Sequence, residues 1–125
     1  MKVEESMEEA FQAIVNYSIM AMIQLEIIAE EDKYEMPPEE ALAVYDKFVS
    51  ETRELMMKKN HDYGEAWRDM RISSITDLVL MKLLRIKQIE ENDGQTLISE
   101  GLKSNYQDIL NYAVFALILL SEKNN

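Results

Sequence analysis

Apolar residues recur at spacings of three and four positions over most of the chain, which is the period of amphipathic α-helices. The pattern predicts a first helix from about residue 4 to residue 29. A second helix is expected to begin at Pro38, a residue that suits the first helical turn, and to end near Asn60. The inward faces of these two helices consist of Phe11, Ile14, Val15, Ile19, Met22, Ile23 and Ile27, then Ala41, Val44, Tyr45, Phe48, Thr52 and Leu55.

Two further helices follow in the second half of the chain. Ser74 with Asp77 resembles a capping box that would begin the third helix. The fourth helix is expected to begin between Ser99 and Ser104, where Ser104 with Gln107 is a second candidate capping box. Their inward faces consist of Val79, Leu80, Leu83 and Ile86, then Tyr106, Ile109, Leu110, Ala113, Val114, Leu117 and Leu120.

The run His61-Asp62-Tyr63-Gly64 interrupts the helical period and is typical of a turn. The residues after it, Glu65–Met70, could form one additional helical turn. No stretch shows the strict alternation of a β-strand. The sequence therefore predicts an all-α protein, an antiparallel bundle of four main helices with short connections.

The first and last predicted helices resemble each other at a shift of about 95 positions. Their matching polar residues carry the comparison, because helix packing does not demand polar side chains at such positions. We interpret residues 1–125 as one helical domain, in which 1–30 resemble the last helix of a preceding repeat and 38–123 form a complete repeat. The alternative is a chance likeness of two amphipathic helices. The matching polar residues are Gln12, Asn16 and Tyr17 in the first helix and Gln107, Asn111 and Tyr112 in the last.

The 125 residues include 24 acidic and 13 basic side chains, for a net charge of −11, with no cysteine and one histidine. This balance disfavours bulk nucleic-acid binding, because phosphate backbones attract positive surfaces, but it permits a divalent cation site. The lack of cysteine excludes disulfides and thiolate metal sites. The acidic N-terminus is unlike a signal peptide, and the apolar tract 109–120 is shorter than the roughly 20 residues of a membrane span. We expect a cytoplasmic protein without membrane contact.

The most distinctive run is 59–68, which contains the pattern Asn-x-Asp-Tyr-Gly-x-Ala-Trp. This run and several residues after it resemble the nucleotide modification associated domain 1 family. The resemblance extends from Tyr45 to Leu120. The resemblance implies a small helical domain tied to nucleotide metabolism or to modified-nucleotide systems. Some members have tandem copies of the unit, and the resemblance implies no reaction. The further matching residues are Ser73-Ser74, Thr76-Asp77, Lys82, Arg85-Ile86, Glu100-Gly101, Asp108 and Asn111-Tyr112.

A looser similarity rests on Glu51-Thr52-Arg53-Glu54, which matches the Glu-x-x-Glu motif of MazG-type all-α nucleoside triphosphate pyrophosphohydrolases. Those enzymes are usually dimeric and hold Mg²⁺ with this motif and a later Glu-x-x-Asp motif. Here the second motif departs, because the segment Asp108-x-x-Asn111 has an amide in place of a carboxylate. The similarity implies a catalytic Mg²⁺ site on Glu51, Glu54 and Asp108. Glu100 would be a further metal ligand if the last helix already includes it.

The positions of these side chains on their helices leave other roles open. Glu51 and Glu54 flank an apolar face, where they would bind Mg²⁺ or form ion pairs with lysines on the same side. Asn111 lies where the last helix becomes apolar on all sides, so we expect it, and Asp108 with it, to face an internal polar site. There Asn111 would contact a nucleotide or satisfy a buried backbone group.

Lys82 and Arg85 lie one helical turn apart among apolar residues, and Arg68 is near them in sequence. These cations would neutralise phosphates or pair with the acids of the chain. Near the predicted turn, Asp62 would contact the substrate or cap the backbone. Tyr63 and Trp67 would stack on a nucleobase, or Trp67 would fill the core and Tyr63 cover a helix end.

Three functions agree with these residues. The first is Mg²⁺-dependent hydrolysis of a nucleoside triphosphate to a monophosphate and pyrophosphate. The second is a non-catalytic helical module that binds a nucleotide or a partner within a nucleotide modification system. The third is a structural helical homodimer, which the extra N-terminal helix would favour.

Overall fold

The computed structural model describes residues 3–29, 37–63, 66–91 and 98–123, with side chains over 6–26, 37–58, 66–91 and 101–122. All secondary structure in these ranges is helical, which confirms the all-α prediction with four main helices and one short helical turn. The helices are α1 (Val3–Ala29), α2 (Pro38–Tyr63), the 3₁₀ helix η1 (Ala66–Asp69), α3 (Ile72–Glu91) and α4 (Ile98–Lys123). None of these helices combines the length and apolar character that a membrane span requires.

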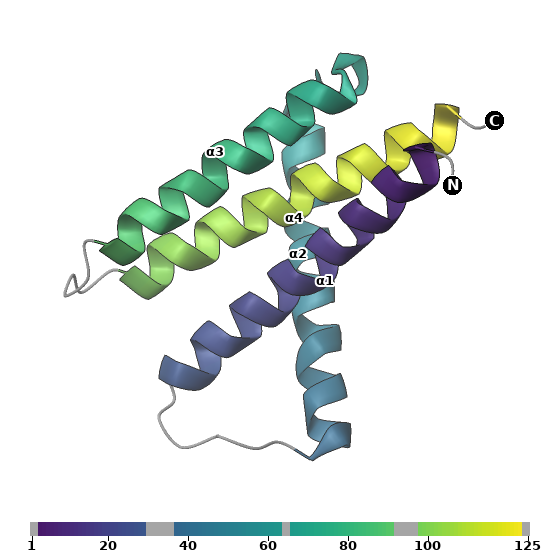
Figure 1. The fold of residues 1–125 in the computed structure, drawn as a ribbon. Coiled ribbons are helices and arrows are strands. Elements are labelled where there is room, and N and C mark those ends of the chain that lie inside the picture. The colour runs from purple at the N-terminus through teal and green to yellow at the C-terminus, as the bar shows by residue number, and fades with distance from the viewer. Residues whose placement is uncertain (1–2, 30–36, 64–65, 92–97, 124–125) are drawn as a thin grey trace.

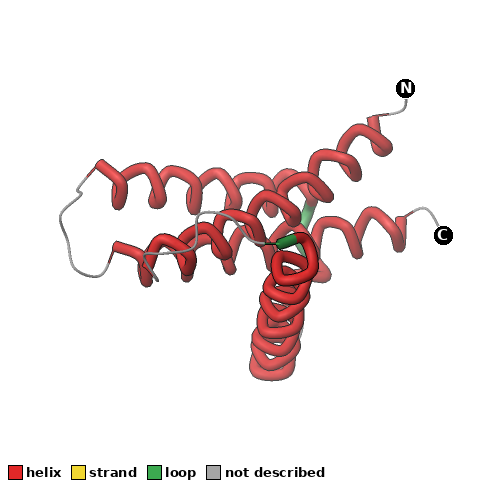
Figure 2. The backbone as a smooth tube through the Cα atoms, turned by 90° about the horizontal axis from the view of Figure 1, so that it is seen from below, coloured by secondary structure: helices red, strands yellow, loops and turns green. Residues whose placement is uncertain are grey.

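Helix α4 lies between α1 and α3, and both neighbours run antiparallel to it (Figure 1). The N-terminal end of α1 lies beside the C-terminal end of α4. Helix α2 crosses this layer steeply and is seen nearly along its own axis in Figure 2. It packs on α1 and, less extensively, on α4. The bundle therefore has a three-helix layer and one crossing helix.

The apolar core follows α4 along its length. Small side chains let α1 approach α4 closely, because Ala113 and Ala116 are completely buried and Ser18 on α1 is only 3% exposed. Three apolar clusters surround α4, and each contains at least one of its residues. The two helices with matching sequences, α1 and α4, pack side by side. The duplication itself stays a prediction.

Three helix ends differ from the prediction. Helix α2 continues to Tyr63, past Asn60, because neither glycine nor proline interrupts the chain before Gly64. Helix α3 begins at Ile72, and the backbone N–H groups of Ser74 and Ile75 donate to the carbonyl of Arg71 at 3.0 and 3.1 Å. Ser74 therefore lies within the first turn and is not the capping residue.

Helix α4 begins at Ile98, so Ser104 lies within the helix and is not a cap either. The predicted face of α3 is partly wrong as well. Leu80 and Leu83 are 56% and 46% exposed, whereas Val79 and Ile86 are buried as expected. Apolar residues occur on more than one side of α3, and contact with α4 decides which side is buried.

Replacing Ala116 with leucine should lower the free energy of unfolding by about 1–3 kcal/mol, because the larger side chain would overpack a completely buried position. Urea denaturation followed by circular dichroism measures this change. Ala43→Leu, at an exposed position of α2, is the matched control and should stay within about 0.5 kcal/mol of the parent protein. Equal effects of the two changes would contradict close packing around α4.

Candidate functional site

A cavity of about 210 Å³ lies among α1, α2 and α4. Two of the side chains that line it, Thr52 of α2 and Asn111 of α4, are uncharged and polar, and Arg53 adds one cation. The other lining residues are apolar: Val15, Ile19, Val49, Met56, Leu110 and Val114.

Two polar atoms on residues that line this cavity are buried without partners among the described residues. Thr52 is 5% exposed and Asn111 is 4% exposed. The hydroxyl oxygen Oγ1 of Thr52 and the amide oxygen Oδ1 of Asn111 have no hydrogen-bond partner within the described part of the chain. A buried polar atom left in this state costs about 1–3 kcal/mol.

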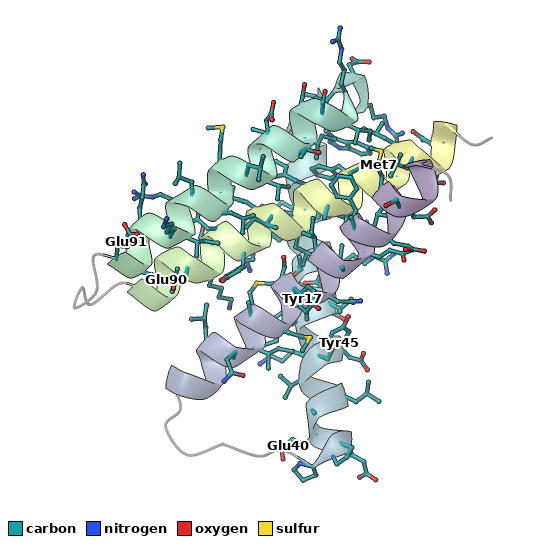
Figure 3. All side chains as sticks on the ribbon, in the orientation of Figure 1. Met7, Tyr17, Glu40, Tyr45, Glu90 and Glu91 are labelled. Carbon is teal, nitrogen blue, oxygen red and sulfur yellow. The ribbon has the colours of Figure 1, made fainter. Side chains whose placement is uncertain are left out.

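The matching asparagine of α1 has a different environment. Asn16 accepts a hydrogen bond from the hydroxyl group of Tyr45 at 2.9 Å, and this bond joins α1 to α2. Figure 3 shows Tyr45 on α2 near the point where α1 crosses it. Of the two corresponding asparagines, only Asn111 lines the cavity. The sequence pattern predicted that Asn111 would be internal. It assigned Thr52 to the apolar face of the second helix, with no role in a site, and it gave no role to Arg53.

Asp108 lies on a neighbouring side of α4, where it forms an ion pair with α3. Its Oδ2 atom is 2.9 Å from Nζ of Lys82, and their side chains are 21% and 33% exposed. The hydrogen bond to Asp108 raises the pKa of Lys82 above 10.5, against the opposing effect of burial. Asp108, which was expected to bind a metal, and Lys82, which was expected to bind phosphate, thus neutralise each other.

This ion pair lines a second hollow of about 500 Å³ between α3 and α4. Arg85 is exposed and lines the same hollow, so the structure brings Lys82, Arg85 and Asp108 together. Gln88 and Asn105 add uncharged polar groups to it. The hollow has charges of both signs and is more open than the cavity among α1, α2 and α4.

Three of the carboxylates expected to hold Mg²⁺ have described side chains, and they lie on two helices. Glu51 and Glu54 are exposed on α2, whereas Asp108 is half-buried and paired with Lys82. Over the described side chains, no group of three histidine or acidic residues could hold a metal ion. The side chain of Glu100 lies outside the described residues. The Mg²⁺ site that the sequence suggested therefore stays a prediction.

Trp67 belongs to the core. Its side chain is 7% exposed, and its ring stacks on Phe115 with centroids 4.5 Å apart and planes inclined by 5°. The guanidinium group of Arg68 lies 4.8 Å from the centroid of the Trp67 ring, and its Nη1 atom is 2.6 Å from Oε2 of Glu122. These contacts favour the core-filling role of Trp67 over base stacking. The side chains of Asp62 and Tyr63 lie outside the described residues.

The fold and the cavity define a class of protein: a small helical domain with an internal, largely apolar site that has buried polar groups. The family model of nucleotide modification associated domain 1 matches residues 1–25 and 59–120, which is most of the chain. The chain belongs to this family. Comparisons with curated proteins and with solved structures find no match. Asn111 lies in the matched part, whereas Glu51, Thr52 and Glu54 lie outside it.

Removing the Trp67 ring should destabilise the fold. Trp67→Ala leaves a hole beside Phe115 and should lower the free energy of unfolding by about 3–5 kcal/mol. Arg68→Gln removes an exposed ion pair and should cost less than about 1 kcal/mol. Denaturation in urea, followed by far-ultraviolet circular dichroism, compares the two variants. A small cost for Trp67→Ala would contradict the core role.

The Lys82–Asp108 ion pair can be tested with a double-mutant cycle. At pH 7, Lys82→Met and Asp108→Asn should each cost about 1 kcal/mol, and the double variant should cost less than the sum. The folded-state pKa of Lys82 is raised above its ordinary value of 10.5. The contribution of the lysine charge to the free energy of unfolding is therefore complete below pH 10.5 and is lost as the pH rises through the higher folded-state pKa. Stability curves measured on both sides of pH 10.5 check this loss, and strictly additive single costs would show that the pair contributes nothing.

Proposed function

We propose that this chain is a non-catalytic nucleotide-binding module and that the cavity among α1, α2 and α4 receives the base. The observation that carries the proposal is a pair of unpartnered, buried atoms, Thr52 Oγ1 and Asn111 Oδ1, on two residues that line a largely apolar cavity. Membership of a family described as associated with nucleotide modification supports a nucleotide as the ligand.

The size of the cavity favours one ring system over a whole nucleotide. Its volume of about 210 Å³ is smaller than the roughly 300–1,000 Å³ of pockets for drug-sized ligands. Apolar walls suit the faces of a flat heterocycle, whose sugar and phosphates would remain outside. Arg53 lines the cavity and is exposed, so it could pair with a phosphate there despite the net charge of −11.

The polar groups of the cavity complement the edge of a base. The amide oxygen of Asn111 accepts a hydrogen bond, so it suits an exocyclic amino group or a ring N–H, and the hydroxyl group of Thr52 can accept or donate. An asparagine side chain pairs in this way with the edge of adenine in nucleic acids. Both residues are uncharged, so the site suits a neutral ring better than a metal ion.

Binding is proposed rather than hydrolysis because of the positions of the carboxylates. Over the described side chains, Glu51, Glu54 and Asp108 do not form a group that could hold a metal. Asp108 is already neutralised by Lys82. The proposal therefore requires neither Mg²⁺ nor turnover.

The experiment is thermal unfolding with a panel of nucleosides, nucleoside monophosphates and nucleoside triphosphates, each with Mg²⁺ and with a chelator. At least one compound should raise the unfolding temperature by a few degrees with or without Mg²⁺, since a ligand at 100 times its Kd stabilises by about 2.7 kcal/mol. Pyrophosphate release is measured in parallel. Release from any triphosphate would favour the hydrolase hypothesis instead.

Two isosteric variants test the site itself. Thr52→Val and Asn111→Leu should each abolish the shift caused by the ligand and should raise the stability of the ligand-free protein by about 1–3 kcal/mol, because each removes a polar atom that is buried without a partner. Thr76→Val, at an exposed position of α3, is the matched control and should keep the ligand response. A shift that both cavity variants retain, or no shift with any compound, would overturn the proposal.

A further inference from the structure

Helix α3 exposes a group of large apolar side chains. Leu80, Met81, Leu83 and Leu84 are between 46% and 64% exposed. Helix α3 lies at the edge of the three-helix layer, with α4 on its inner side (Figure 1). Side chains of α3 project away from α4 in Figure 3. Met81 and Leu84 also line the hollow between α3 and α4. Large exposed apolar side chains gathered on one helix favour an interaction surface.

The order of residues along this face is symmetric. Asp77, Leu80, Leu84 and Lys87 follow each other at spacings of three, four and three residues, so they share one side of the helix. All four side chains are exposed, whereas Val79, on a different side, is buried. The face therefore has an acid at one end, two leucines in the middle and a base at the other end.

We propose that two copies of this chain associate through this face, with their α3 helices antiparallel. The spacing is symmetric about position 82, and a two-fold axis there would place Leu80 of each copy against Leu84 of the partner subunit. The same axis would place Asp77 of each copy beside Lys87 of the partner subunit. The occupant of the face is thus a second copy, because the face complements itself in charge and in apolar contact.

Charge also fixes the direction of the pair. A parallel arrangement would place each Asp77 beside the partner's Asp77 and each Lys87 beside the partner's Lys87, and both contacts are repulsive. The antiparallel arrangement makes two attractive pairs instead. These pairs oppose the general repulsion between two chains that each have a net charge of −11.

The experiment measures the dimer dissociation constant of the full chain by analytical ultracentrifugation over a range of concentrations. Leu84→Glu should weaken the dimer at least about 100-fold, because the two-fold axis makes the change act twice. Leu42→Glu is the matched control, since Leu42 is similarly exposed, at 62%, but lies on α2. It should leave the dissociation constant within about threefold of the parent value. Circular dichroism checks that both variants keep their helices.

Charge reversal tests the pairing without changing the apolar contact. Asp77→Lys and Lys87→Asp should each weaken the dimer about tenfold, and the double variant should return to within about threefold of the parent protein. Because the chain has no cysteine, L80C and L84C can also be introduced singly. When the two are mixed and oxidised, the unlike pair should form a disulfide in preference to either like pair.

Three results would overturn the proposal. The first is a monomer at every concentration up to the millimolar range. The second is a dimer that Leu42→Glu dissociates and Leu84→Glu does not, which would place the interface on α2. The third is a preference for disulfides between like cysteines, which would show a parallel pair. None of these results depends on whether the cavity binds a nucleotide.

Discussion

The fold depends on the packing of α4 between two antiparallel neighbours. Helix α4 is apolar on nearly all sides after Asn111, and such a helix is stable in water only when it is covered all round. Ala113 and Ala116 let the neighbouring backbones approach, and both are completely buried. Each of the three apolar clusters includes residues of α4. The positions of α1 and α3 follow from this requirement.

Helix α2 is attached more loosely, and the cavity results from that attachment. Of its described side chains, only Phe48 and Thr52 are buried, so α2 contacts the layer mainly near one crossing point. The hydrogen bond from Tyr45 to Asn16 joins α1 and α2 there. A steeply crossing helix cannot follow the groove between α1 and α4, and the space that it leaves becomes the cavity beside Thr52.

The helical period was sufficient to predict the four helices and the internal position of Asn111, because burial repeats along a helix every three to four residues. The period could not predict which side of α3 is buried, because Leu80 and Val79 are both apolar and lie on different sides. Contact with α4 decides that Val79 is buried and Leu80 is exposed. The serine patterns were misleading because Ser74 and Ser104 lie within helices. A capping motif is a local signal, whereas the start of each helix also depends on packing.

The site was harder to predict, because spacing within one helix does not say which other helix each residue meets. Asp108 and Asn111 are three residues apart, so they point about 60° apart around α4. That difference is enough to give them different neighbours, since Asp108 pairs with Lys82 of α3 while Asn111 shares a cavity with Thr52 of α2. The residues of α2 therefore meet an uncharged amide and not a carboxylate. A buried site with an amide and a hydroxyl group selects a neutral hydrogen-bonding group, and a divalent cation would need the charged oxygens that α4 presents to α3.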